Sequence, residues 1–270
     1  KTKRELKRAI LFLNVLFGAL IAFDLVVFLP KAFKKNSYNP PGLSRQFINC
    51  DTCRKPDVYV IIADEYAGHQ ELREVLSFDN SAFEHDLEQR GFKVVNYTKS
   101  NYNATVYSMA SLFNMGYIKL SAKDLVTQRD MLLCRSIINN NNVGSFFKKL
   151  GYSLHNHSFF AFQGKKKAVN NFYFHPKSRI LTFETFVNRF MKDAGFNFFS
   201  KKKKEAVEKN DWLNDEIMDS LTKKTAAEKI NKPKFVYTHF TRPHHPYFVD
   251  RNGLPPVVAD SLKGFARIQK

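Results

Sequence analysis

An uninterrupted apolar run near the N-terminus constrains this chain most. Ala9 to Pro30 reads AILFLNVLFGALIAFDLVVFLP, and the basic segments KTKRELKR and KAFKK lie on its two sides. A helix needs about 20 apolar residues to cross the hydrocarbon core of a bilayer, so this run is long enough. Because it is apolar on every side and has basic flanks, we expect a transmembrane helix rather than a buried core helix, and therefore a protein of the cell membrane.

Other features of this run bear on its topology. Asp24 is the one charged residue inside it and argues against a simple span. A signal peptide is disfavoured because no small-x-small cleavage site follows, and Lys31 to Lys35 is typical of an anchor at the membrane edge. Basic residues on both sides leave the orientation open. The first residue is Lys rather than Met, as expected of a fragment or a processed form.

The chain is strongly basic, with 43 Lys and Arg against 25 Asp and Glu and a formal net charge of +18. Such a charge favours an anionic partner, either nucleic acid, a membrane surface or a phosphorylated substrate. No nucleic acid is expected as a partner, since no recognised binding motif or basic repeat interleaved with aromatic residues occurs. The runs Lys165–Lys167 and Lys201–Lys204 are typical of solvated loops, with anionic lipid headgroups as the alternative contact.

The chain has three cysteines, too few for a disulfide scaffold. The pair in Cys50-Asp51-Thr52-Cys53 is compatible with a redox loop, part of a metal clip or an incidental spacing. Zinc is disfavoured because no second cysteine pair follows. We therefore expect a local disulfide between Cys50 and Cys53, in a compartment outside the cytoplasm.

The remainder predicts an α/β domain behind a tether. The tether contains NPPG and has no periodic apolar pattern. The β-branched run Val58 to Ala63 is typical of a parallel strand buried on both faces. Further strands alternate with helical patterns, which indicates a mainly parallel sheet sandwiched by helices.

The expected divisions are a basic flank at 1–8, a transmembrane helix at 9–30, a linker at 31–56 and a folded domain at 57–270. The further strands are expected at Phe92–Tyr97, Tyr152–His155 and Lys232–Phe240, and the helical stretches at Gln70–Arg90 with a break near Ser77–Asn80, from Thr105, before Gly151 and at Lys204–Lys229.

Two adjacent carboxylates follow the first of these strands. Asp64 and Glu65 come directly after VYVIIA, and ligands of open α/β sheets bind at the carboxyl ends of the strands. Adjacent carboxylates are costly to desolvate unless a cation holds them, and hard divalent metals take oxygen ligands. The pair therefore indicates a metal site, with capping of the following helix as the alternative.

Thr105 is expected at a helix N-terminus, where backbone N–H groups and the helix dipole favour anions. A phosphoryl group attached to its hydroxyl would be stabilised there. The alternative is a plain N-cap, a position that favours Thr for structural reasons.

The segment THFTRPHHPYF, Thr238 to Phe248, places three histidines and two prolines after a strand. An imidazole-rich loop at the same sheet edge is suited to binding a metal or an anionic substrate. Histidines at a strand end also serve structural roles, so each remains open. Gly-rich phosphate fingerprints are absent from the sequence, which weakens a nucleotide-binding interpretation.

Three stretches together resemble a known family. They are KPDVYVIIADEYAG, FDNSAFEHDLEQRGFKVVNYTKSNYNATVYSMASLFNM and FVYTHFTRPHHPYFVDRNG. In this order they resemble the membrane-anchored sulfatase-like proteins of the alkaline phosphatase superfamily, with chemistry nearest to lipoteichoic acid synthases and phosphoethanolamine transferases. The resemblance covers roughly Asp57 to Gly253. Residues 164–229 match nothing in the family pattern.

The resemblance implies an extracytoplasmic catalytic domain that transfers or hydrolyses a phosphoester of a lipid or envelope glycan. It implies a divalent cation, Mn, Zn, Mg or Ca, as the cofactor. Asp64 matches the first metal ligand of the family, and Glu65 matches the second acidic residue of some members. Thr105 matches the nucleophile, which also contacts the metal.

The resemblance also implies groups that bind the substrate. Asn103 matches a donor to a non-bridging phosphate oxygen, and His244 matches the His-x-Pro-aromatic element that contacts substrate in the transferases. His245 and His239 match this element less well.

The sequence departs from the family in two respects. The Cys/Ser-x-Pro-x-Arg motif that becomes formylglycine in true sulfatases is absent, so phosphoester chemistry is favoured over sulfate ester hydrolysis. The later Asp-His-Gly motif that completes the family's metal site is also absent before Lys270, so 57–270 is expected to be the N-terminal portion of the catalytic domain. A non-catalytic binding or sensing module with half of the metal site is the alternative.

Overall fold

The computed structural model describes residues 2–33, 52–119, 127–170 and 200–244. Helix α1 and the sheet belong to two separate units of the chain, and each is described by itself. Helix α1 spans Thr2–Phe33 and includes Pro30. Its segment Leu6–Pro30 has a mean hydropathy of 2.5, none of it is buried, and it is long and apolar enough to cross a membrane. The expected helix at 9–30 is confirmed, and it extends into both basic flanks. Residues 34–51 of the expected linker lie outside the described residues.

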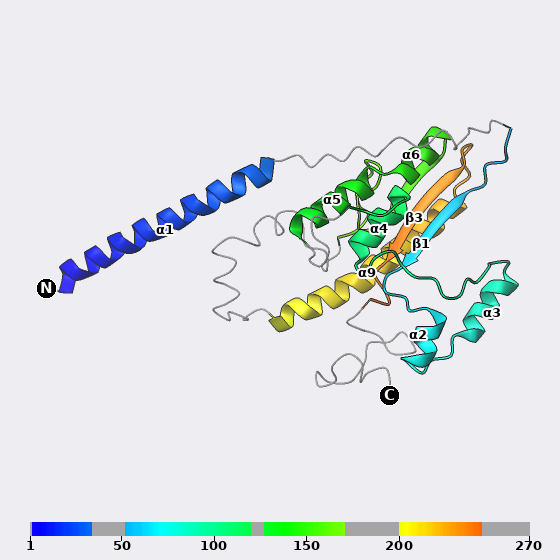
Figure 1. Cartoon of the computed structure of the whole chain (residues 1–270), viewed down its shortest axis with the longest axis horizontal. Helices are drawn as coiled ribbons and strands as arrows, with labels where there is room; N and C mark the ends of the chain where they lie inside the picture. Colours follow the sequence, from blue (N-terminus) through cyan, green and yellow to red (C-terminus); the bar gives the residue numbers. More distant parts are fainter. Residues whose placement is uncertain (1, 34–51, 120–126, 171–199, 245–270) are drawn as a thin grey trace. The chain divides into compact units, whose positions relative to one another are not determined.

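The second unit contains a parallel sheet of three strands, β1 (Val58–Ala63), β2 (Ser153–His157) and β3 (Lys234–Phe240). Strands β1 and β3 lie side by side (Figure 1). The strand order is β1-β3-β2, and Ala63 of β1 lies opposite Phe240 of β3. Because all three strands run in one direction, their carboxyl ends meet at one edge of the sheet. The expected α/β class with a parallel sheet is confirmed for this small sheet.

The burial of the strands differs from the expectation in one respect. Strand β3 is the central strand and is buried along almost its whole length. Strand β1 was expected to be buried on both faces, and this is wrong, because it lies at an edge of the described sheet and the Ile61 side chain is 56% exposed. The continuous apolar run therefore does not distinguish a central strand from an edge strand.

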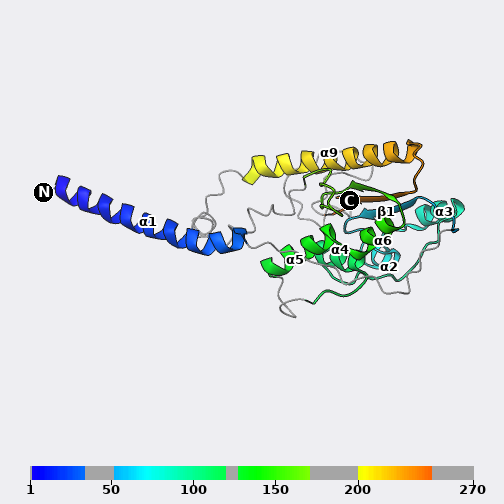
Figure 2. The same cartoon turned by 90° about the horizontal axis from the view of Figure 1, so that it is seen from above.

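Helices cover both faces of this sheet. Figure 2 shows α9 along one side of the sheet and α4 and α6 on the other. Helices α2 and α3 bury no residue. The break expected within 70–90 is confirmed between α2 and α3. The helices of this part are α2 (His69–Glu74), α3 (Ser81–Gln89), α4 (Thr105–Asn114), α5 (Gln128–Asn139), α6 (Asn142–Lys149) and, from residue 207 on, α9 (Ser200–Ala227).

The strand expected at Phe92–Tyr97 is wrong, since these residues form turns and irregular backbone. The side chains of Phe92, Val95 and Tyr97 are 63%, 59% and 82% exposed. A β-branched and aromatic segment is stabilised as a strand only when it pairs with a neighbouring strand and packs one face against a core. Neither is present among the residues that the structure describes around this segment.

Aromatic rings form the core between β3 and the helices of one face. The Phe113 ring of α4 lies edge-on to Tyr237 at 4.7 Å and to Phe162 at 4.9 Å between ring centroids. Phe162 stacks on Phe235 at 5.8 Å. All four side chains are at most 1% exposed. Each such pair adds about 0.5–1.5 kcal/mol to the burial of its area, so this cluster fixes α4 against the sheet.

On the other face, polar contacts join α9 to the strands. Buried Lys234 donates from Nζ to the carbonyl oxygens of Thr225 at 3.0 Å and Glu228 at 2.9 Å, near the C-terminal end of α9. A cation there interacts favourably with the helix dipole. Thr222 of α9 shares a hydrogen bond of 2.7 Å with Thr238 of β3. These contacts hold α9 parallel to the sheet.

The cysteines agree with the expectation where they are described. Cys53 is disulfide-bonded, and Cys50, its expected partner, lies outside the described residues. Cys134 is free and buried in α5, and burial together with the nearby charge of Asp130 raises the pKa of its thiol to about 12.

The aromatic core yields a first prediction. Phe113→Ala should lower the free energy of unfolding by about 3–5 kcal/mol, because it removes a buried ring and leaves a cavity against Tyr237. Phe83→Ala, at a ring that is 50% exposed on α3, is the control and should change it by less than about 1 kcal/mol. Urea unfolding followed by circular dichroism measures both, and equal losses would contradict the assigned core.

His157 yields a prediction on pH. Its ring lies between Thr222 and Thr225 of α9, and burial first, then the neighbouring His155, lowers its pKa below the ordinary 6.5. The unfolded chain therefore binds more protons than the folded chain just below pH 6.5, so stability falls as the pH falls through this window.

The melting temperature should consequently drop less between pH 7.5 and pH 5.5 in His157→Gln than in the wild type. The drop should not vanish, because the pKa of His155 is lowered as well. His85→Gln on exposed α3 should retain the full drop. A drop that is identical in all three proteins would rule out protonation of His157 as a cause.

Candidate functional site

Asp64 lies at the carboxyl edge of the sheet, as predicted. It follows β1 directly, and its backbone N–H donates to the carbonyl of Phe240 at the end of β3, at 3.1 Å. This bond extends the strand pairing by one residue, so the position of Asp64 is fixed by the sheet. The residue is only 6% exposed, which makes its carboxylate costly to desolvate without a partner.

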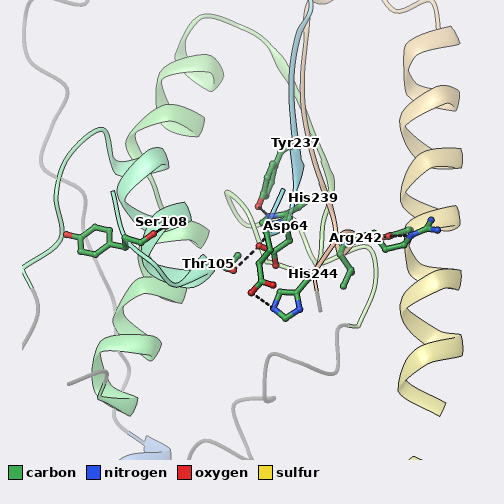
Figure 3. A network of polar contacts seen from close by, with 11 residues as sticks. Asp64, Thr105, Ser108, Tyr237, His239, Arg242 and His244 are labelled. Atoms are coloured by element: carbon green, nitrogen blue, oxygen red, sulfur yellow. Dashed lines mark hydrogen bonds and ion pairs between the residues drawn. The ribbon is translucent and has the colours of Figure 1, made fainter. Parts of the chain in front are cut away.

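Thr105 provides that partner. It is the first residue of α4, and its hydroxyl donates to Oδ1 of Asp64 at 2.9 Å (Figure 3). The cap position is occupied by Ala104, so the alternative that Thr105 is the N-cap is wrong. Its side chain instead faces the sheet edge across 41 residues of sequence. The N-terminus of a ten-residue helix and a buried carboxylate therefore meet at one hydroxyl.

His239 lies on the other side of Asp64 (Figure 3). It is fully buried in β3, with Nε2 at 3.8 Å from Oδ1 of Asp64. Its Nδ1 shares a hydrogen bond of 2.7 Å with the hydroxyl of Tyr237. Burial first, and then the charge of Asp64, raises the pKa of Tyr237 well above its ordinary range, so this group is a neutral phenol.

Glu65 and His244 form a second pair beside this one. Nε2 of His244 lies 3.1 Å from Oε1 of Glu65, so the predicted second acidic residue contacts the predicted substrate-binding histidine. Glu65 has a φ of 59°, in the left-handed region that non-glycine residues rarely adopt. Such conformations persist where surrounding contacts hold them, and they cluster at functional sites.

Two other predicted residues contribute less to the described geometry. Asn103 is exposed, two residues before Thr105 in the bend that leads into α4. His245 lies outside the described residues. The structure thus brings together Asp64 with Thr105, and Glu65 with His244, and leaves the substrate contacts of Asn103 untested.

The loop after β3 is held by a buried carboxylate of α9. Asp215 is 2% exposed and accepts hydrogen bonds from the backbone N–H groups of Thr241 at 2.7 Å and Arg242 at 3.1 Å. It also accepts from Nε of Arg242 at 2.8 Å. A turn follows immediately, in which the backbone N–H of His244 donates a hydrogen bond to the carbonyl of Thr241 at 3.0 Å. Asp215 therefore fixes the backbone that carries His244.

Sequence reasoning missed Tyr237 and Asp215. Tyr237 and His239 are two residues apart on one strand, and this spacing places their side chains on one face. That alternation was readable in the sequence. Asp215 lies in a helix with many other charged residues, and nothing in the sequence distinguishes it from a solvated one.

The residues present fit a divalent cation. Oδ2 of Asp64 and Nε2 of His239 are buried polar atoms that have no hydrogen-bond partner within the described ranges. In these ranges no group of three or more His, Cys, Asp and Glu side chains is arranged to hold a metal. The carboxylate of Asp64, the hydroxyl of Thr105 and the imidazole of His239 nevertheless lie close together. A set of oxygen and imidazole donors of this kind suits Zn or Mn.

Comparison with protein-family models, with curated proteins and with solved structures found no match. The geometry of these residues is therefore the basis for a functional interpretation.

The clamp at Asp215 yields a prediction. Asp215→Asn replaces one of the two acceptor oxygens by an NH₂ donor that faces N–H groups, so the backbone N–H of either Thr241 or Arg242 loses its buried hydrogen bond. Hydrogen exchange of the amides of Thr241, Arg242 and His244 should become at least about tenfold faster, in keeping with a loss of more than about 1.4 kcal/mol.

Glu216→Gln is the matched control, because Glu216 is adjacent, half-exposed and only 4.0 Å from Nη2 of Arg242. The amide exchange rates of Thr241, Arg242 and His244 in this variant should remain those of the wild type. Unchanged exchange in Asp215→Asn would show that the loop is held by other contacts.

Proposed function

We propose that this protein is a membrane-anchored, metal-dependent hydrolase or transferase of the sulfatase-like type that acts on phosphoesters through Thr105. The observation that carries the proposal is the hydrogen bond from the Thr105 hydroxyl to Asp64. It joins a nucleophile at a helix N-terminus to a buried acceptor at the carboxyl edge of a parallel sheet. These are also the two residues that match the family's first metal ligand and its nucleophile in the sequence.

The bond between Thr105 and Asp64 suits nucleophilic attack. Oγ1 of Thr105 would bond to phosphorus as the bond from phosphorus to the leaving oxygen breaks. The hydroxyl proton would leave along the existing bond to Oδ1 of Asp64, and water would protonate the leaving oxygen. The oxygen of a water molecule or of an acceptor hydroxyl would then bond to phosphorus as the bond from phosphorus to Oγ1 of Thr105 breaks. The proton on Asp64 would return to Oγ1, and the attacking group would lose its own proton to solvent, which completes hydrolysis or transfer.

Asp64 and Thr105 would hold the divalent cation, whether Mn, Zn, Mg or Ca, with Glu65 as the further acidic candidate. Bound there, the cation would neutralise charge on the nucleophile and on the phosphoryl oxygens. Thr105 is the first residue of α4, and the helix dipole would favour a phosphate at this end of the helix. Asn103, His244 and His245 remain the candidates for binding the substrate oxygens.

Features outside the sheet support a location at the membrane. Helix α1 has the length and hydropathy of an anchor, and a signal sequence would share them. The net charge of +18 suits anionic lipid or envelope glycan phosphoesters. The disulfide at Cys53 is expected in an oxidising compartment, which supports a domain outside the cytoplasm.

A non-catalytic binding module is the second candidate. The specific observation in its favour is that no described group of three acidic or histidine side chains can hold a metal. Such a module would bind a phosphoester without converting it.

Turnover of bis(4-nitrophenyl) phosphate with added Mn²⁺ separates the two candidates. Thr105→Ala should lower kcat/KM by at least about a thousandfold, since removal of a nucleophile abolishes the covalent route. Thr105→Ser keeps a hydroxyl and should retain much of the activity. Ser108→Ala is the matched control, because Ser108 is one turn further along α4 and its hydroxyl donates to the carbonyl of Tyr102 at 2.6 Å.

The expected order of activity is wild type and Ser108→Ala first, Thr105→Ser next and Thr105→Ala last. Equal turnover in wild type and Thr105→Ala would eliminate Thr105 as the nucleophile. Binding of the phosphodiester without any turnover by the wild type would favour the non-catalytic module.

A further inference from the structure

His239 has a place that a substrate-binding residue would not have. It is fully buried within β3, and the Phe159 ring lies 4.5 Å from the imidazole between centroids. No face of the ring reaches solvent, so a substrate has no access to it. Its free nitrogen nevertheless faces Asp64, the residue that is proposed to hold the cation.

We propose that Nε2 of His239 is a ligand of the same divalent cation as Asp64 and Thr105. This inference rests on the proposed function, and it assigns His239 a role in holding the metal rather than in contacting substrate. The described part of the site would then supply an oxygen donor directly after β1, an oxygen donor from α4 and a nitrogen donor from β3.

The distance between the two side chains supports this assignment. Nε2 lies 3.8 Å from Oδ1 of Asp64, which is too long for a hydrogen bond. Ligand atoms bound about 2.0–2.2 Å from one metal ion lie roughly 3–4 Å from each other, so the observed separation suits two ligands of one ion.

The unsatisfied atoms support it independently. Oδ2 of Asp64 and Nε2 of His239 are both buried without a hydrogen-bond partner among the residues that the structure describes. An unpaired buried polar atom is costly, and here one such atom belongs to the carboxylate of Asp64 and the other to the imidazole beside it. One cation between them would satisfy both atoms. A direct ion pair would instead draw Nε2 to hydrogen-bonding distance of the carboxylate.

The surroundings of the ring are those of a metal-binding histidine. Such residues are usually oriented by a hydrogen bond at the other ring nitrogen, and Nδ1 of His239 has this bond with Tyr237 at 2.7 Å. With Nε2 directed to the cation, Nδ1 carries the ring proton and donates it to the oxygen of Tyr237. The contacts with Phe159 and Phe160, at 4.5 and 5.9 Å, restrict the ring further. Tyr237 is therefore a positioning residue.

Binding of Mn²⁺ to the full chain tests the assignment, with pulsed electron paramagnetic resonance to detect imidazole nitrogen coupled to the metal. The wild type should show this coupling. His239→Gln keeps the size of the side chain and should remove the imidazole coupling, with a loss of Mn²⁺ affinity of at least about tenfold. Tyr237→Phe should keep the coupling and weaken the affinity less. His244→Ala is the control for the neighbouring imidazole and should keep the coupling.

Near-ultraviolet circular dichroism confirms that each variant is folded, and His239→Ala provides a second removal of the nitrogen. Imidazole coupling that persists in folded His239→Gln, or Mn²⁺ bound by the wild type without such coupling, would overturn the assignment. The absence of Mn²⁺ binding by the wild type would overturn it as well.

Turnover of bis(4-nitrophenyl) phosphate, measured on the same samples, separates this inference from the proposed function. Turnover that depends on Thr105 without nitrogen coupling would leave the proposed function intact and reject His239 as a ligand. Coupling that depends on His239 without turnover would establish the ligand and favour the non-catalytic module.

Discussion

The hydrogen bond between Thr105 and Asp64 depends on the placement of three elements, β1, β3 and α4. Asp64 is placed by β1 and by its backbone bond to Phe240 of β3, and Thr105 is placed by the packing of α4 on the sheet. A carboxylate that is 6% exposed would be unfavourable in an apolar core without this hydroxyl. The fold thus concentrates one poorly satisfied charge where strand ends and a helix N-terminus meet, which is where an anionic substrate and a cation can be bound together.

Strand β3 connects the core to this site because its side chains alternate between two faces. Phe235, Tyr237 and His239 face the α4 side, where Tyr237 packs on Phe113 and also bonds to His239. Thr238 faces α9 and bonds to Thr222. The aromatic side chains of β3 therefore pack tightly in the core, and through Tyr237 they hold the imidazole of His239 in place beside Asp64. Rigid support of this kind is what a catalytic or metal-binding residue requires.

Local sequence patterns predicted the positions of Asp64 and Thr105, because each of these residues lies at the end of a helix or strand. A β-branched run that ends in Asp64, and an apolar helical pattern that begins at Thr105, determined where these two residues lie once a parallel sheet was assumed. Longer-range facts were not predictable in the same way. The exposed segment at Phe92–Tyr97 has strand-like composition without a pairing partner, and the choice of Asp215 among the many charges of α9 depends on the loop that packs against it. Tyr237 was accessible through the two-residue period of β3. The fold class was therefore more predictable than the polar contacts that position the loop of His244.

Trapping the phosphoryl group on the protein is the most direct measurement of whether Thr105 accepts it. The protein would be incubated with Mn²⁺ and bis(4-nitrophenyl) phosphate, quenched in acid and digested with trypsin, which releases the peptide Ser100–Lys119. Mass spectrometry with fragmentation of this peptide should locate the nitrophenyl phosphoryl group on Thr105, and the adduct should be absent from Thr105→Ala. Turnover by the wild type with an unmodified peptide at every quench time, or a phosphoryl group on Ser108 instead, would contradict the account.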